Sequence, residues 1–160
     1  MNFSTKKIAY QKALEKAMRY CVYQERCILD VENRLLAWGL PKAEWDKLID
    51  TLVEQDFLNE NRYIEDYVRG KFLIKKWGKN KIKAGLLQKK IRGSEVDKNL
   101  MAIDENEYKK TIHYLIEKKK ALLNQKDDIE LRDKLYRYLL SKGYESEIIV
   151  SELKITNLSQ

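Results

Sequence analysis

The chain has 160 residues, of which 44% are hydrophobic and 36% charged, and its formal net charge is +7. This length allows one domain or a row of small units with buried cores, while one Pro and six Gly argue against a turn-rich β protein and against disorder. The sequence shows no apolar signal region and no apolar run long enough for a membrane span, so we expect a cytoplasmic protein without a membrane segment.

Apolar residues recur at intervals of three and four along the chain, which predicts amphipathic helices. Gly39 is expected to end the second helix, Pro41 to lie near the first turn of the third, and Gly78 and Gly143 to interrupt later stripes. The nine stripes are marked, in chain order, by Leu14, Ala17, Met18 and Cys21; Val31, Leu35 and Trp38; Trp45, Leu48, Ile49 and Leu52; Tyr63, Ile64, Tyr67, Val68 and Phe72; Ile82, Gly85 and Leu86; Val96 and Leu100; Tyr108, Ile112, Leu115 and Ile116; Leu131, Leu135, Tyr138 and Leu139; and Ile149 and Leu153.

The stripes repeat at offsets of 51 and 53 residues. We therefore expect an all-α fold of three tandem three-helix, helix-turn-helix-like repeats in an elongated arc, with residues 1–58, 59–103 and 104–160 forming the repeats and the protein a monomer. Trp38 and Trp45 lie on these stripes and are expected in the core. The five aligned triples are Val31, Ile82 and Leu135; Leu35, Leu86 and Leu139; Leu40, Ile91 and Tyr144; Trp45, Val96 and Ile149; and Ile49, Leu100 and Leu153.

Positive charge is concentrated in residues 69–92, which contain ten Lys or Arg and no Asp or Glu, so the rest of the chain sums to −3. A solvated helix face normally mixes signs, and like charges at i,i+4 destabilise a helix. The acid-free segment therefore favours contact with a polyanion such as DNA over the simpler alternative of a solvated face. The ten candidate DNA-binding or filament-binding residues are Arg69, Lys71, Lys75, Lys76, Lys79, Lys81, Lys83, Lys89, Lys90 and Arg92.

Other polar residues allow more than one interpretation. Trp77 could stack on a base or a partner side chain, although a core or hinge position is the commoner role for such a residue. Glu25 and Arg26 could pair at a junction between helices. Lys118, Lys119 and Lys120 have acids on both sides in sequence and are expected to form a solvated face.

The sequence offers no catalytic motif, since no P-loop, GxGxxG, HExxH or nucleophile elbow is present. His113 has no Cys, Ser or second His in a usable pattern. Cys21 and Cys27 are six residues apart in a helical pattern, point to different faces and are expected to be reduced. We therefore expect no enzymatic activity, no metal and no cofactor.

Residues 56–91, DFLNENRYIEDYVRGKFLIKKWGKNKIKAGLLQKKI, resemble the central signature of the RecX family of recombination regulators. The matching elements are an aromatic-Leu pair, an Asn-rich turn, Arg62-Tyr63, Tyr67-Val68, Gly78 and the basic run up to Lys89-Lys90-Ile91. Upstream, QERCILDVENRLLAWGL resembles the first-repeat signature of the family. The likeness covers residues 10–155.

Three residues depart from the family pattern. Lys79 stands where the family usually has Pro, Lys90 where it has Gly, and Ile64 where it has Ala. The first two substitutions add positive charge to the basic segment.

The resemblance implies a cytoplasmic, all-α, non-enzymatic modulator of the RecA recombinase. Such proteins lie along the RecA–DNA filament and inhibit ATP hydrolysis and strand exchange. The expected partners are thus the RecA filament and single- or double-stranded DNA. Two alternatives stay open: a helix-turn-helix-type DNA-binding protein that acts independently of RecA, and a helical-repeat protein scaffold.

Overall fold

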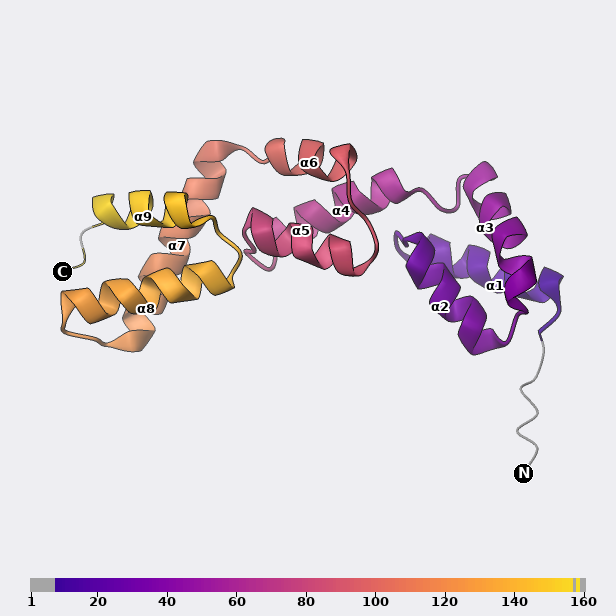
Figure 1. Ribbon diagram of the computed structural model, residues 1–160, viewed down its shortest axis with the longest axis horizontal. Helices are drawn as coiled ribbons and strands as arrows, with labels where there is room; N and C mark the ends of the chain where they lie inside the picture. Colours follow the sequence, from indigo (N-terminus) through magenta and orange to yellow (C-terminus); the bar gives the residue numbers. More distant parts are fainter. Residues whose placement is uncertain (1–7, 157, 159–160) are drawn as a thin grey trace, which may run out of the picture. The chain divides into compact units, whose positions relative to one another are not determined.

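The computed structural model describes residues 8–156 and Leu158. In this part of the chain all regular structure is helical, with no strand, and none of the helices is both long and apolar enough to span a bilayer. The helices are α1 (Tyr10–Tyr23), α2 (Ile28–Trp38), the 3-10 turn η1 (Lys42–Glu44), α3 (Trp45–Glu54), α4 (Glu60–Leu73), α5 (Lys79–Gln88), α6 (Ser94–Met101), α7 (Glu105–Leu123), α8 (Asp128–Ser141) and α9 (Ser146–Ile155) (Figure 1).

Two compact units make up the chain, Met1–Asp66 and Tyr67–Gln160, and α4 begins in the first and ends in the second. The all-helical fold and the nine helices expected from the apolar stripes are confirmed within the described residues. The division into repeats at residues 58 and 103 and the elongated arc stay predictions.

In the first unit, α1, α2 and α3 pack around one apolar core (Figure 1). Gly39 ends α2 as predicted, with φ of 80°, and its N–H donates to the carbonyls of the last turn. Trp38 and Trp45 pack against the core but stay partly exposed, so their expected core position is only half correct. Trp45 is too large for full burial and directs its indole N–H to the carbonyl of Leu40 at 2.9 Å.

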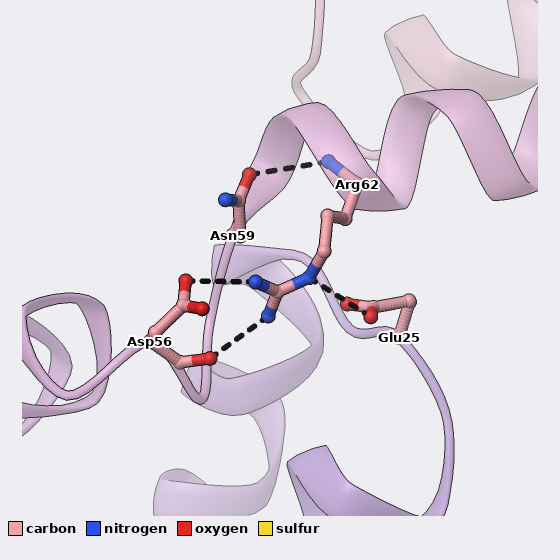
Figure 2. A network of polar contacts seen from close by, with 4 residues as sticks. All are labelled: Glu25, Asp56, Asn59 and Arg62. Carbon is pink, nitrogen blue, oxygen red and sulfur yellow. Dashed lines mark hydrogen bonds and ion pairs between the residues drawn. The ribbon is translucent and has the colours of Figure 1, made fainter.

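The start of α4 is tied to the first unit by polar contacts (Figure 2). Arg62 donates from Nε to Glu25 at 3.0 Å and from its two terminal nitrogens to the side chain and carbonyl of Asp56. Glu60 accepts the N–H of Ile28 at 3.0 Å and so caps α2. The carboxylate of Glu25 thus pairs with Arg62 of a later helix, and not with Arg26 as the sequence allowed.

The repeat alignment is confirmed by burial. All fifteen aligned side chains are buried except that of Trp45, which is partly buried. Leu35, Leu86 and Leu139 are all completely inaccessible to solvent, as equivalent positions in three copies of one packing unit should be. The sequence offsets therefore identify positions of similar burial, while the division of the chain into three repeats stays a prediction.

Candidate functional site

Two glycines fix the turn between α4 and α5, which carries Lys75 and Lys76. The N–H of Gly78 donates to the carbonyl of Lys142 at 2.8 Å, and the N–H of Asn80 donates to that of Gly143 at 2.9 Å. A Cβ on Gly78 would lie 2.4 Å from the backbone of Gly143, and one on Gly143 would lie 2.2 Å from Cβ of Lys81. Since Gly143 also has φ of 96°, only glycine fits there, and the start of α5 is held against the α8–α9 turn.

Two buried tyrosines also stabilise the contact between the start of α5 and the α8–α9 turn. The hydroxyl of Tyr144 donates to the carbonyl of Lys76 at 2.7 Å. The hydroxyl of Tyr108 accepts the N–H of Lys79 at 3.0 Å and donates to Glu145 at 2.5 Å. Burial raises the pKa of both tyrosines well above the ordinary value, so both stay protonated donors. A proline in place of Lys79 has no N–H to give to Tyr108, so this departure from the family pattern is used structurally.

As a result, lysines from separate elements gather on one surface. Lys142 lies partly buried at the end of α8, and its pKa is lowered by burial and by the charges of Lys81, Lys118 and Lys75. These four come from the α4–α5 turn, α5, α7 and α8, and within the described residues none of them forms an ion pair. Three lysine charges act on the partly buried ammonium of Lys142, and positive charges gathered without an ion pair favour the binding of an anion. We call Lys75, Lys81, Lys118 and Lys142 the lysine cluster.

Aromatic rings place the ammonium groups around the lysine cluster. Lys71 and Lys81 lie over the ring of Trp77, with Nζ 4.7 and 4.6 Å from its centroid. Lys76 and Lys118 lie over Tyr114 at 5.6 and 5.8 Å. Such contacts restrict a flexible lysine without using its N–H donors. The Nζ of Lys76 also donates to the carbonyl of Leu73 at 2.9 Å, which leaves two of its three donors for a ligand. Trp77 is partly buried in the turn, and its ring orients Lys71 and Lys81, while the expected core or hinge role stays a prediction.

The structure separates the ten sequence-predicted basic residues into groups. Lys75 and Lys81 lie in the lysine cluster, and Lys71 and Lys76 are held against its aromatic rings. Lys79 lies over the buried Tyr108 with Nζ 4.8 Å from the ring centroid. Elsewhere in the second unit, Lys89 is partly buried with its charge near Tyr67, and Arg69, Lys90 and Arg92 are exposed.

Lys83 corrects the expectation of an uncompensated segment. Its ammonium forms an ion pair of 3.0 Å with Asp97 of α6. The acid-free run in sequence is therefore not acid-free in space, because the turn after α5 brings α6 back alongside it. The ion pair with Asp97 makes Lys83 a weaker candidate for an anion contact than the members of the lysine cluster.

Sequence reasoning missed two members of the lysine cluster. Lys142 received no assignment, and Lys118 was expected on a solvated face. Lys142 occupies the repeat position of Lys89, which was the only signal that could have drawn attention to it. The contact between the α8–α9 turn and the start of α5 has no local signature, so the proximity of Lys142 to Lys81 needed a structure.

His113 has a structural partner. Its Nε2 lies 2.5 Å from Oε2 of Glu152, a buried carboxylate, and its Nδ1 lies 3.3 Å from Oγ1 of Thr156. The contact ties α7 to α9 and satisfies the carboxylate, as a buried acid requires. Among the described residues, no three His, Cys, Asp or Glu side chains are placed to hold a metal ion together.

Comparison with known proteins adds a family context. Two family models match, described as the second three-helix domain of RecX over residues 59–100 and its third three-helix domain over 106–151. A regulatory protein RecX of Clostridium tetani is 33% identical over 90% of this chain and 67% of its own length, and one of Clostridium botulinum strain Eklund 17B is 32% identical over 92% and 70%. The crystal structure of RecX from Lactobacillus salivarius superimposes with a TM-score of 0.80 at 24% identity, over 90% of this chain and 94% of that one.

Proposed function

The chain belongs to the RecX family of regulatory proteins, and from this premise we propose that it regulates the RecA recombinase by binding the RecA–DNA filament. In this proposal the protein inhibits ATP hydrolysis and strand exchange without catalysing a reaction itself. It acts in the context of homologous recombination and DNA repair. The lysine cluster, with Lys71 and Lys76 beside it, contacts the phosphates of the DNA in the filament.

The observation that carries the proposal is that the contact between the start of α5 and the α8–α9 turn brings Lys142 close to Lys75, Lys81 and Lys118, none of which forms an ion pair within the described residues. Repulsion among the four ammonium groups destabilises the free protein slightly, and a row of phosphates relieves it. Lys is a compact point charge that suits phosphate oxygens, and each phosphate contact releases counterions from the nucleic acid. The proposed contact is therefore to the backbone and independent of base sequence.

The residue types of the lysine cluster favour this function over a sequence-specific DNA-binding protein. Helices that read base edges present Arg, Asn or Gln at their exposed start, because these side chains form paired hydrogen bonds with bases. The first turn of α5 holds one residue of this kind, the exposed Asn80, between Lys79 and Lys81, whose ammonium groups lie over aromatic rings. A scaffold without a nucleic-acid partner gives no reason for the lysine cluster.

The test is the ATPase activity of RecA on single-stranded DNA in the presence of this protein. The triple variant K75Q/K81Q/K142Q should need about tenfold more protein for half-maximal inhibition, because three phosphate contacts are lost. The matched control is K98Q/K126Q/K134Q, which removes three exposed lysines of the same unit that form no ion pair within the described residues. Lys118, Lys119 and Lys120 are unsuitable as a control, since Lys118 belongs to the lysine cluster.

Three results would count against the proposal. If the unaltered protein leaves RecA ATP hydrolysis unchanged, the regulatory function itself fails. If both triple variants lose inhibition equally, bulk charge explains the binding. If neither variant loses inhibition, the filament is bound by another surface and the lysine cluster has no part in it.

A further inference from the structure

The first unit carries a second cationic site, built from arginine and tyrosine. Arg26 and Arg34 both lie over the ring of Tyr20, with Cζ 3.7 and 5.0 Å from its centroid. The Nε of Arg26 also donates to the carbonyl of Tyr20 at 3.0 Å. These contacts hold two guanidinium groups at one ring and leave most of their N–H donors unused.

No carboxylate of the described part of the chain pairs with either arginine. Glu25, the acid adjacent to Arg26 in sequence, is held by Arg62 (Figure 2). Arg62 therefore removes the nearest internal competitor and leaves Arg26 available to an external anion.

Exposed apolar surface adjoins the two arginines. Tyr23 is 83% exposed and its ring lies 5.9 Å from Cζ of Arg26, and Val22, beside it at the end of α1, is 72% exposed. Arg and Tyr are the residue types enriched at the energetically dominant positions of protein–protein interfaces, whereas Lys is depleted there. A phosphate backbone has no apolar group that could pack on the exposed side chain of Val22.

The net charge of the first unit favours a protein over a nucleic acid as the ligand of the two arginines. Residues 1–66 contain ten Lys or Arg and twelve Asp or Glu, a net charge of −2, whereas residues 67–160 contain 22 and 13, a net charge of +9. Nucleic-acid binding needs a positive field summed over many residues, and the first unit lacks one. A carboxylate, in contrast, is bound at short range by the planar guanidinium group, which donates two parallel hydrogen bonds to its two oxygens.

We propose that Arg26, Arg34, Tyr20 and Tyr23 form a docking site for an acidic protein surface, where aspartate or glutamate carboxylates pair with the two guanidinium groups and an apolar side chain packs on Tyr23 and Val22. This inference rests on the proposed function in one respect, since it makes the recombinase protein, not the DNA, the ligand of the first unit. The protein would then bind the filament through two chemically different contacts.

The test compares binding of the full chain to single-stranded oligothymidylate alone and to a RecA filament on the same oligonucleotide. The variant R26Q/R34Q should bind the oligonucleotide as the unaltered protein does and the filament about tenfold more weakly. The variant R26K/R34K keeps the charge but loses the planar fork and should recover only part of the filament affinity. The control K12Q/K42Q removes two exposed charges of the same unit and should change neither affinity.

Titration of the full chain with an acidic peptide tests the docking site without RecA. A short peptide rich in Glu and Leu should shift the Nε–Hε resonances of Arg26 and Arg34 in the full chain, and oligothymidylate should not. If the unaltered protein does not bind the filament, the proposed function fails and this titration alone decides the docking site. Shifts caused by the oligonucleotide and not by the peptide would overturn the inference in favour of a phosphate contact, and so would a filament affinity of R26Q/R34Q equal to that of the control.

Discussion

The lysine cluster of the second unit and the Arg26–Arg34 pair of the first are both cationic, yet they are built differently. The lysines come from four separate elements, repel one another and include Lys142 with a lowered pKa. The arginines share the ring of Tyr20 in an acidic unit beside exposed apolar side chains. Positive charge alone therefore does not identify a ligand. Residue type, the net charge of the unit and the neighbouring surface together favour phosphates for the lysine cluster and carboxylates for the Arg26–Arg34 pair.

The largest effect should follow from disturbing the turn that assembles the lysine cluster. Gly143→Ala places a Cβ 2.2 Å from that of Lys81 at a left-handed position, so we expect a loss of about 3 kcal/mol in the free energy of unfolding. Oligonucleotide affinity should fall as well, while peptide shifts at Arg26 and Arg34 should persist. Denaturant unfolding and both titrations measure this.

The control for that substitution is Gly93→Ala. Gly93 also has positive φ, of 120°, but a Cβ there meets nothing within 4 Å. Only backbone strain then remains, at about 1–2 kcal/mol. Equal losses at both glycines would show that the contact between the α8–α9 turn and α5 contributes nothing to stability.

The next effect is on the salt dependence of DNA affinity, which should differ between variants of the lysine cluster and variants of the Arg26–Arg34 pair. K75Q/K81Q/K142Q should make the log–log salt slope for single-stranded DNA shallower by about 2, from about 0.7 per phosphate contact. R26Q/R34Q should leave that slope unchanged, because carboxylate pairing takes no part in DNA binding. Fluorescence anisotropy at several salt concentrations gives both slopes, and a shallower slope for the arginine variant would remove the distinction between the surfaces.

Tyr144→Phe should have a smaller effect. The ring stays in the core, but the carbonyl of Lys76 loses its donor, which costs about 1–2 kcal/mol of unfolding free energy. Because that carbonyl belongs to the turn that bears Lys75 and Lys76, DNA affinity should fall a few-fold. Tyr138→Phe is the control, since the hydroxyl of this partly buried tyrosine makes no hydrogen bond within the described part of the second unit. DNA affinity that drops equally in both variants would contradict the positioning role.

The smallest effect concerns pH. The folded-state pKa of Lys142 is below the ordinary value of 10.5, so between the two values the folded protein binds fewer protons than the unfolded chain. Stability should therefore rise with pH through that window, because loss of the charge removes the cost of burying it and the repulsion by Lys81, Lys118 and Lys75. DNA affinity should fall over the same window, because the neutral amine no longer attracts phosphate, and K142Q should flatten both profiles. Profiles unchanged by K142Q would assign the titration to another group.

Much of the fold could be predicted from the sequence, because it depends on local periodicity. The helical stripes, the end of α2 at Gly39 and the equivalence of Leu35, Leu86 and Leu139 all follow from the spacing of apolar residues. The contacts that assemble the candidate sites could not be predicted from the sequence. The pairing of Gly78 with Gly143, the ion pair of Lys83 with Asp97 and the capture of Glu25 by Arg62 join residues that are distant in the chain.

The most direct test of the central claim is the reactivity of individual lysines toward an amine-acetylating reagent, read by mass spectrometry in the free protein and in its complex with single-stranded DNA. Lys75, Lys81, Lys118 and Lys142 should lose reactivity together when DNA binds, whereas Lys12, Lys98 and Lys126 should react as before. Equal protection of both sets, or unchanged reactivity of the lysine cluster in a saturated complex, would contradict the assignment of the phosphate contact to these four residues.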